Sequence, residues 1–497
     1  MLRSRSRSLC SSAAKHITYQ STRGGQTGLK FGDAVLQGLA HDKGLLVPNK
    51  IPTFDLKTLN SWRGLKFHEL AYQIMKMYIP ENEVPAENLK DILKRSYQTF
   101  RHEDVTPLTP LDGKDGRMWC LELYHGPTFA FKDVALQFLG NLFEFLLQER
   151  GGKITVVGAT SGDTGSSAIY GLRGKAGVEC FMMYPEGRTS MTQELQMITV
   201  MDENIHNIAL GGTFDDCQSV VKTLFNDPPF RNKVNIAAVN SINWARILAQ
   251  TVYYVYAYLK IMPVNATEKI SFSVPTGNFG DILAGYYAKK MGLPVESLLV
   301  ATNENDILHR FFQSGDYSTN GVRETLSPSM DIQVSSNFER FLYHMGGNDA
   351  SACKELMDRF ESKGALEPSK ALVDACCTEM ASERVTDAET LAEINDVYQT
   401  RDKYTLDPHS AIAVAAGRKH LSKIKGPMVN LCCAHWAKFS PVVEKAIGKE
   451  ELSKLVADEF PYELSKLTSL PKRNAPLPNN VDAVKIFIEE TLKSRQS

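Results

Sequence analysis

The sequence predicts an α/β fold, with two doubly wound, mostly parallel-sheet domains that follow a helical N-terminal region. Two observations predict this class. Strand-like runs alternate with helix-like runs through the middle of the chain, and the alternation returns in the second half. The run KITVV at residues 153–157 is rich in β-branched residues without polar alternation, as expected of a strand buried on both faces. A chain of 497 residues is too long for one core, so roughly three folding units are expected.

The first part of the chain has the pattern of helices and then of alternating strands and helices. Residues 18–105 are expected to be mainly helical, and the turn-rich sequences VTPLTPL and DGKDG then mark a linker. Residues 106–235 are expected to form the first α/β domain. Its predicted elements are a strand at 118–123, a helix after Asp133, the strand at 153–157, a helix through 169–173, a strand at 178–184, a helix after Ser190, a strand at 205–210 and a helix after Asp215.

The second α/β domain is expected over residues 236–497 and ends in a helical extension. A strand at 269–274 leads into the glycine-rich loop TGNFGD, and a helix follows that ends at Gly292. Residues 350–400 are polar and helix-rich, and residues 428–433 have a strand pattern. The stretch PKRNAPLPNN is expected to be a loop before a last helix at 481–493.

Composition excludes several classes of partner. The hydrophobic fraction of 43%, the charged fraction of 23% and the net charge of −1 are those of an ordinary globular protein, with no general attraction for nucleic acid or a charged membrane. No apolar run reaches the ~18 residues of a spanning helix. The nine cysteines form no CxxC pair, so reduced thiols are expected rather than a metal site or a disulfide framework.

The first 17 residues form a basic leader. Four cations lie among many serines, and no acidic residue precedes Asp33, which is the composition of a transit peptide. The expected location is therefore the matrix of a mitochondrion or another organelle. The alternative is a disordered basic arm on a cytoplasmic protein.

Lys132 lies where the aromatic turn HGPTFAFK meets a long apolar helix. A cation at the start of a helix opposes the helix dipole. Such a lysine is usually a solvated side chain, but a desolvated one loses its proton easily and attacks carbonyl groups. The other motifs of the chain must decide between these interpretations.

Three further segments have the composition of anion-binding loops, and each precedes or opens a helix. In TGNFGD, residues 276–281, two glycines let the backbone approach a phosphate at a helix N-terminus. In TSGDTGSS, residues 160–167, hydroxyls and amides suit a carboxylate, although Asp163 must pair with a donor. In NSINWARILAQ, residues 240–250, an arginine with a nearby amide and hydroxyl suits a phosphate.

Taken together, these segments indicate two anion pockets beside one lysine. A phosphorylated aldehyde cofactor would occupy one pocket and form an imine with the lysine, and a phosphorylated substrate would occupy the other. Pyridoxal 5′-phosphate meets these requirements.

The motifs HGPTFAFKD, GATSGDTG, NSINWARILAQ, PTGNFGD and AHWAKF resemble those of the threonine synthase family in order and approximate spacing. The sequences YQSTRGG and GLAHDKGLLVP resemble the start of the longer-chain branch of that family, and the resemblance covers nearly everything from Tyr19 onward. It implies the tryptophan synthase β-like fold, which is fold-type II of the pyridoxal phosphate enzymes. It also implies conversion of O-phospho-L-homoserine and water to L-threonine and phosphate by a monomer or homodimer.

The resemblance also implies roles for individual residues. Lys132 would be the Schiff-base lysine and the catalytic residue, and Asp163 would lie near the ring hydroxyl of the cofactor. The residues implied for the cofactor phosphate are Gly277, Asn278, Phe279, Gly280 and Asp281. Those implied for the substrate carboxylate are Thr160, Ser161, Gly162 and Thr164, and those for the substrate phosphate are Asn240, Ser241 and Arg246.

Two positions depart from the family pattern and keep alternatives open. The family usually shows a TAHPAKF-like run whose threonine hydroxyl meets the pyridine nitrogen, but here Cys433 replaces threonine and Trp436 replaces proline. A thiol is a poorer hydrogen-bond partner than a hydroxyl, so altered ring electronics are expected. The first alternative is a threonine synthase-like phospholyase that acts on O-phosphorylated hydroxyamino acids. The second is a non-catalytic pyridoxal-binding interaction protein.

Overall fold

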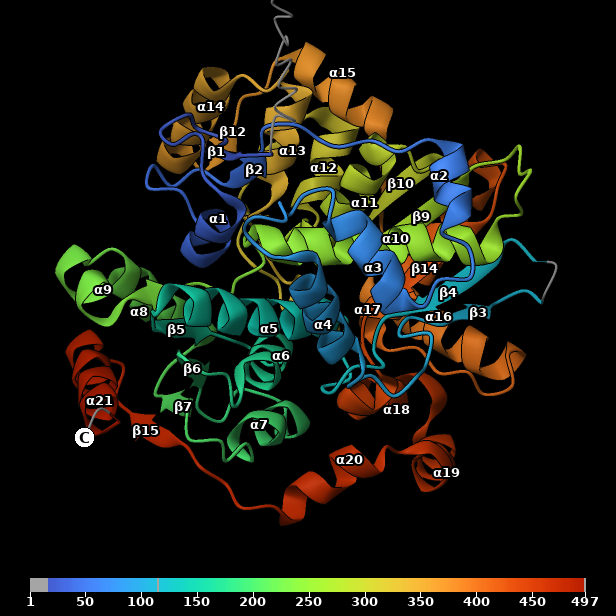
Figure 1. Ribbon diagram of the computed structural model, residues 1–497. Coiled ribbons are helices and arrows are strands. Elements are labelled where there is room, and N and C mark those ends of the chain that lie inside the picture. Colours follow the sequence, from blue (N-terminus) through green and yellow to red (C-terminus); the bar gives the residue numbers. More distant parts are fainter. Residues whose placement is uncertain (1–16, 114–115, 496–497) are drawn as a thin grey trace, which may run out of the picture.

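Two mostly parallel sheets form the cores of two lobes in the computed structural model, which describes residues 17–113 and 116–495 (Figure 1). The larger sheet has the strand order β13-β10-β9-β14-β4-β3, and the smaller has β15-β7-β6-β5-β8. Every neighbouring pair in them is parallel except β3 and β4. The predicted fold class is confirmed. The strands of the larger sheet are β3 (Leu108–Pro110), β4 (Met118–Glu122), β9 (Ile270–Pro275), β10 (Val295–Thr302), β13 (Met380–Arg384) and β14 (Met428–Cys432). Those of the smaller sheet are β5 (Ile154–Ala159), β6 (Val178–Pro185), β7 (Ile205–Leu210), β8 (Ile236–Ala237) and β15 (Ala475–Leu477).

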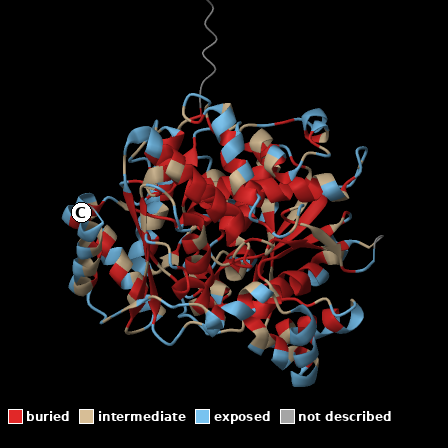
Figure 2. Ribbon diagram, turned by 60° about the horizontal axis from the view of Figure 1, so that its bottom comes forward, coloured by how far each residue is buried: buried red, intermediate tan, exposed pale blue. Residues whose placement is uncertain are grey.

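Buried helices fill the space between the two sheets. Helix α5 (Lys132–Arg150) packs on α6 (Asp163–Leu172) and on α10 (Trp244–Ile261), and α10 packs on α11 (Gly280–Met291). Apolar residues cover nearly every face of α5 and α10, which is the pattern of helices enclosed on all sides. Figure 2 shows the buried residues concentrated in these helices and in the sheets. On the far face of the larger sheet, α17 (Pro408–His420) packs on β9 and β14.

The N-terminal region is mainly helical, as predicted, and its helices pack on α5 and α10. It also contains a small antiparallel pair of strands that the sequence did not suggest. Its elements are β1 (Tyr19–Ser21), α1 (Phe31–Gln37), β2 (Leu46–Pro48), α2 (Leu56–Ser61), α3 (Phe67–Met75) and α4 (Ala86–Tyr97).

The remaining helices surround the sheets. They are α7 (Met191–Ile198), α8 (Phe214–Phe225), α9 (Pro228–Val234), α12 (Ile307–Ser314), α13 (Phe338–Met345), α14 (Ala350–Lys363), α15 (Lys370–Glu379), α16 (Asp387–Thr400), α18 (Ser440–Ile447), α19 (Lys449–Glu459), α20 (Tyr462–Ser465) and α21 (Val481–Ser494). A second two-stranded sheet joins β11 (Tyr317–Ser318) to β12 (Ala365–Leu366). Short 3-10 turns complete the chain at Pro328–Met330, Leu421–Lys423, Trp436–Phe439 and Lys466–Ser469.

The sheets do not follow the expected division of the chain at residues 106 and 236. Strands β3 and β4 belong to the larger sheet, whereas β8 and β15 belong to the smaller one. The stretch PKRNAPLPNN, expected to be a loop, contains β15, which pairs with β7 at the edge of the smaller sheet. Proline is typical of loops, and Pro476 therefore led to the prediction of a loop here. A strand at the edge of a sheet can nevertheless contain proline.

Two sequence expectations concern membranes and targeting. In the described residues, no helix combines the length and apolarity that a bilayer span requires. The basic leader predicted over residues 1–17 lies outside the described residues except for Ile17.

Candidate active site

Lys132 is buried at the start of α5, with 9% of its surface exposed. The turn before it pairs with the segment after β14: Phe131 N–H donates to the carbonyl oxygen of Cys433 at 2.7 Å, and His435 N–H donates to that of Phe129 at 3.2 Å. Within the described part of the chain, the Lys132 amine has neither a hydrogen bond nor an ion pair, and it lies 4.6 Å from the centre of the Phe131 ring. The solvated interpretation of this lysine is therefore wrong.

The environment of Lys132 favours a neutral amine. Burial lowers its pKa, and the charge of Asp163 partly opposes this shift. The cations Lys438 and Arg246 lower the pKa further. A buried lysine with a lowered pKa is a good nucleophile and a good proton acceptor near neutral pH.

A second buried lysine of the predicted site, Lys438, has an ion pair and a hydrogen bond. Lys438 Nζ forms an ion pair with Asp163 Oδ1 at 2.7 Å and donates to the carbonyl oxygen of Thr128 at 2.9 Å. Gln193 Nε2 donates to the same carboxylate oxygen at 2.9 Å. Burial alone would raise the pKa of Asp163, but the charges of Lys438 and Lys132 hold it well below its ordinary value. The donor that the sequence required for Asp163 is thus Lys438, which stands in AHWAKF without an assigned role.

The TGNFGD loop forms a strained turn between β9 and α11. Phe279 has a left-handed backbone with φ of 62°, which is costly for a residue with a side chain. Phe279, Gly280 and Asp281 are buried residues, and none of their N–H groups has a hydrogen-bond partner among the described residues. A Cβ on Gly277 would lie 3.1 Å from the carbonyl oxygen of Ser329, so the backbone at Ser329 packs closely against the loop. Unpaired buried amides at a helix N-terminus fit a phosphate group.

The Asp281 side chain turns away from these amides. Its Oδ1 accepts hydrogen bonds from the hydroxyls of Tyr253, at 2.5 Å, and Tyr254, at 2.8 Å. Burial raises its pKa to about 6, while the positive charge of Lys132 acts in the opposite direction. The charges of Asp281 and Lys132 therefore influence one another.

The TSGDTG loop connects β5 to α6 in the smaller sheet. Thr160 Oγ1 accepts hydrogen bonds from the N–H groups of Gly162, at 2.9 Å, and Gly165, at 2.8 Å, so this hydroxyl shapes the turn. Gly162 has φ of 151° and lies against the side chain of Gln193. Ser161 is exposed and Thr164 half-buried. Neither hydroxyl has a hydrogen-bond partner among the described residues, so both are available to a ligand.

Arg246 is the most informative residue of the NSINWAR segment. It is 3% exposed and its Nη1 donates to the carbonyl oxygen of Val239 at 2.9 Å, but its buried Nε has no partner. No carboxylate of the described residues pairs with it, and burial lowers its pKa to about 10. A buried guanidinium without a counter-ion is costly unless a ligand supplies the anion. Asn240 is exposed and Ser241 is half-buried at the same loop.

The sheet topology explains how these segments meet. Strands β4, β9 and β14 are adjacent and parallel, so their carboxyl ends bring the Lys132 turn, the TGNFGD loop and Cys433 to one edge. Strands β5 and β8 are adjacent in the smaller sheet and carry the TSGDTG loop and the NSINWAR segment. One edge thus presents an amine and the unpaired amides of a loop, and the other presents hydroxyls and a guanidinium that has no carboxylate partner among the described residues.

Comparisons with known proteins agree with this arrangement. Residues 18–97 match the family model described as threonine synthase N terminus, residues 99–433 match pyridoxal-phosphate dependent enzyme, and residues 410–488 match threonine synthase, C-terminal. Threonine synthase of Schizosaccharomyces pombe is 45% identical, over 97% of this chain and all of that protein. The chain belongs to the threonine synthase family. Like that family, it is a pyridoxal-phosphate-dependent lyase of threonine biosynthesis.

Solved structures support the same family. The crystal structure of yeast threonine synthase superposes with a TM-score of 0.91 at 45% identity, and 96% of this chain and 99% of that chain are covered. A pyridoxal-phosphate-bound threonine synthase from Brucella melitensis gives a TM-score of 0.89 at 42% identity, with the same coverage. The unpaired amides of the TGNFGD loop and the unpartnered Lys132 amine fit a phosphorylated aldehyde.

The two departures from the threonine synthase pattern have different surroundings. Cys433 is buried, and burial together with the charges of Asp281 and Asp407 raises the pKa of its thiol well above the ordinary value, so the thiol is neutral. Trp436 is also buried and packs against Phe460, with ring centroids 6.0 Å apart. The tryptophan therefore anchors the C-terminal segment that follows.

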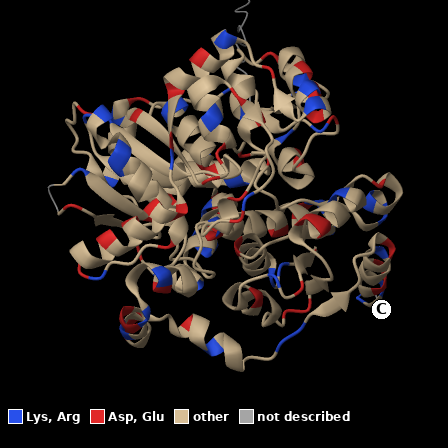
Figure 3. Ribbon diagram, turned by 180° about the vertical axis from the view of Figure 1, so that it is seen from behind, with Lys and Arg blue, Asp and Glu red and all other residues tan. Residues whose placement is uncertain are grey.

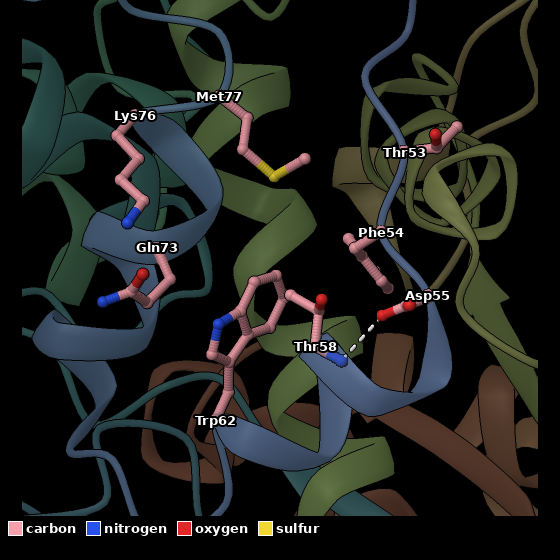
Figure 4. A pocket seen from close by; sticks show the side chains of 8 residues that line it. All are labelled: Thr53, Phe54, Asp55, Thr58, Trp62, Gln73, Lys76 and Met77. Carbon is pink, nitrogen blue, oxygen red and sulfur yellow. Dashed lines mark hydrogen bonds between the residues drawn. The ribbon is translucent and has the colours of Figure 1, made fainter.

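An open pocket of about 580 Å³ lies elsewhere, in the N-terminal region (Figure 4). Phe54 N–H donates to the carbonyl oxygen of Met291, and Arg63 donates to that of Leu259, which places this region at the C-terminal ends of α10 and α11. The predicted site lies at the N-terminal ends of the same helices, and no predicted site residue lines the pocket. Its lining residues are Thr53, Phe54, Asp55, Thr58, Trp62, Gln73, Lys76 and Met77.

Proposed function

We propose that the protein converts O-phospho-L-homoserine and water into L-threonine and inorganic phosphate. The observation that carries this proposal is the buried guanidinium of Arg246, whose Nε has no hydrogen-bond partner and which has no carboxylate partner among the described residues. It supports a substrate that has a phosphate of its own, because the amides of the TGNFGD loop already suit the cofactor phosphate. Family membership supports the same substrate.

Lys132 would supply the amine for the cofactor and then move protons. Pyridoxal phosphate, when bound, supplies an aldehyde for an amine and a ring that withdraws electrons from the α-carbon of an amino acid. The lowered pKa of Lys132 leaves Nζ able to accept a proton from Cα of the substrate and, after it has passed that proton on, to accept another from Cβ. The protonated amine can return a proton where the product requires one.

The other residues would bind and orient the substrate. Arg246, with Asn240 and Ser241, would hold the γ-phosphate as it leaves, and the hydroxyls of Ser161 and Thr164 with the loop amides would hold the carboxylate. Thr160 and Gly162 would shape that loop. Because Lys438 neutralises Asp163, the carboxylate of Asp163 would not repel the substrate anion.

Cys433 would lie near the ring nitrogen of the cofactor, and Asp163 near its ring hydroxyl. A neutral thiol is a weak hydrogen-bond donor, so Cys433 would leave the ring nitrogen less strongly bound than a hydroxyl does. The N–H groups of the TGNFGD loop, from Gly277 to Asp281, would hold the cofactor phosphate.

Product analysis tests the proposal. Purified protein loaded with pyridoxal phosphate is incubated with O-phospho-L-homoserine, and phosphate, threonine and oxo acid are measured together. Equal amounts of phosphate and threonine are expected. Phosphate with an oxo acid would indicate a phospholyase instead, and the absence of turnover with O-phosphohomoserine and O-phosphothreonine would indicate a binding protein.

A further inference from the structure

Residues 335–337, Ser-Ser-Asn, lie between the two loops that are proposed to bind phosphate. Asn337 is fully buried, and its Nδ2 donates to the carbonyl oxygen of Asn278 at 3.0 Å and to that of Ser241 at 3.2 Å. Its own N–H also donates to the Asn278 carbonyl, at 3.1 Å. One side chain therefore joins the TGNFGD loop to the NSINWAR segment.

Arg340, one turn further along α13, holds Asn337 in place. It is fully buried and donates to Asn337 Oδ1 at 2.5 Å, to the carbonyl oxygen of Ile242 at 2.6 Å and to that of Leu46 at 2.9 Å. These bonds fix the orientation of the Asn337 amide, because its oxygen accepts from Arg340 and its nitrogen must then face the two loops.

The N-terminal motifs reinforce this arrangement. Leu46 follows GLAHDKG and lies in β2, and Arg23 of YQSTRGG forms a buried ion pair with Glu339, with 2.9 Å between Nη2 and Oε2. Thr22 also donates to Glu339 at 2.5 Å. The start of α13 is thus bound on one side to the N-terminal strands and on the other to both loops.

We propose that Asn337, oriented by Arg340, is a positioning residue that fixes the separation of the two phosphate-binding loops. This inference rests on the proposed function for the identity of the two ligands. Its consequence is that the affinity for cofactor phosphate and the affinity for substrate phosphate both depend on the Asn337 side chain. Ser336 lies at the same junction, with its Oγ 3.2 Å from Asn278 Oδ1 and 3.5 Å from Ser241 Oγ.

Ser335 offers a matched control because it contacts only one loop. Its Oγ donates to the carbonyl oxygen of Gly277 at 2.6 Å, and it makes no hydrogen bond to the NSINWAR segment. Removal of this hydroxyl should loosen the cofactor loop alone, whereas removal of the Asn337 amide should loosen both loops.

The experiment compares Asn337→Ala with Ser335→Ala in the full-length holoenzyme. Three quantities are measured: the Kd of pyridoxal phosphate, the KM of O-phospho-L-homoserine, and the Kd of inorganic phosphate from its effect on the cofactor absorbance. Asn337→Ala should raise all three by roughly fivefold or more, which corresponds to the loss of about one buried hydrogen bond per loop. Its kcat should fall less than its KM rises. Ser335→Ala should raise only the Kd of pyridoxal phosphate.

The outcomes separate this inference from the proposed function. If Asn337→Ala leaves the Kd of inorganic phosphate unchanged, or resembles Ser335→Ala, the inference is overturned. The phosphate titration needs no turnover, so it still decides the question if O-phosphohomoserine is not the substrate. Should Asn337→Ala fail to fold, Arg340→Lys takes its place, since it keeps a donor but loses the planar fork. It should raise the same affinities, and unchanged phosphate affinities would overturn the inference.

Discussion

The two buried lysines of the site differ in what surrounds each amine. Lys438 is held by Asp163 and by the carbonyl oxygen of Thr128, so its amine is committed to two partners. Lys132 has no such partner among the described residues, and burial lowers its pKa. Asp163 and Lys438 neutralise one another, which leaves Lys132 and Arg246 as the buried basic side chains of the predicted site that have no carboxylate partner among the described residues.

Arg246 gives the first prediction at this scale. Arg246→Ala should lower kcat/KM for O-phospho-L-homoserine by about 10- to 100-fold, because a charge-assisted hydrogen bond contributes about 1.5–3 kcal/mol. The rise in KM should dominate, and the Kd of pyridoxal phosphate should change little. Steady-state kinetics and a cofactor titration measure both quantities. An unchanged kcat/KM would remove Arg246 from the phosphate site.

Arg246→Lys serves as the control for charge. Lysine keeps the positive charge but loses the planar fork that binds phosphate bidentately. It should restore part of the activity lost in Arg246→Ala, and equal activities of the two variants would show that charge has no part in binding.

Asp281 gives a prediction about pH and stability. Its folded pKa, about 6, lies above the ordinary value of 3.8. The group therefore stabilises the folded state most below pH 4, and this contribution is lost as the pH rises to about 6, with a total of about 2–3 kcal/mol. Asp281→Asn keeps an oxygen for both tyrosines but cannot ionise. Between pH 4 and pH 7 its Tm should rise relative to that of the natural protein. Parallel Tm profiles across this range would contradict the pKa assignment.

At the scale of elements, close packing of α5 on α6 positions two of the loops. The two helices cross at glycines: a Cβ on Gly140 would overlap the carbonyl oxygen of Gly171, and one on Gly171 would overlap that of Leu136. Because Lys132 begins α5 and Asp163 begins α6, this crossing fixes the distance between the ends that carry them. The sequence predicted both helices from their apolar spacing, but not the crossing, because periodicity says nothing of which helices meet.

Gly140→Ala should therefore destabilise the protein. Overpacking of this kind costs about 1–3 kcal/mol, and thermal unfolding should show a lower Tm. Gly152→Ala is the matched control, because its Cβ would make an ordinary contact of 3.6 Å with Leu147 at a backbone angle that alanine accepts. Equal Tm values for the two variants would refute the close crossing.

At the scale of the whole molecule, the chain passes three times between the two sheets. Strands β3 and β4 begin the larger sheet before the chain enters the smaller one. After β14 the chain returns, adds β15 to the smaller sheet and ends in α21, which packs on α8 (Figure 1). Charged residues of both signs are interspersed over the lobes in the view of Figure 3, in keeping with the net charge of −1.

The sequence was sufficient to predict which loops follow the strands of the two sheets. It was not sufficient to predict the contacts that join these loops. Glycine, hydroxyl and arginine patterns predicted three anion-binding loops, and the family resemblance predicted the cofactor. The roles of Lys438 and Asn337 were not predicted, because their partners, Asp163 and the loop carbonyl oxygens, are distant from them in the sequence. The sequence does not distinguish a buried lysine from an exposed one unless its carboxylate partner is known. An asparagine that donates hydrogen bonds to carbonyl oxygens likewise has no sequence motif by which it could be predicted.

The packing of the C-terminal helix α21 on the lobe of the smaller sheet gives a prediction about stability. In α21, Ile488 is fully buried in the cluster that includes Phe181, Ile208 and Leu224, whereas Ile486 is 56% exposed. Ile488→Ala should lower the free energy of unfolding by about 2–5 kcal/mol, and Ile486→Ala should change it by less than about 0.5 kcal/mol. Denaturant titration measures both. Equal effects would mean that α21 does not pack on this lobe through that face.

The most direct test of the account asks which lysine bonds to the cofactor. The holoenzyme is reduced with borohydride, which makes the bond between lysine and pyridoxal phosphate permanent, and its peptides are then sequenced by mass spectrometry. The unpartnered, buried amine of Lys132 predicts that the label lies on the peptide that contains Lys132 and on no other. A label on Lys438, or on no lysine, would contradict the account.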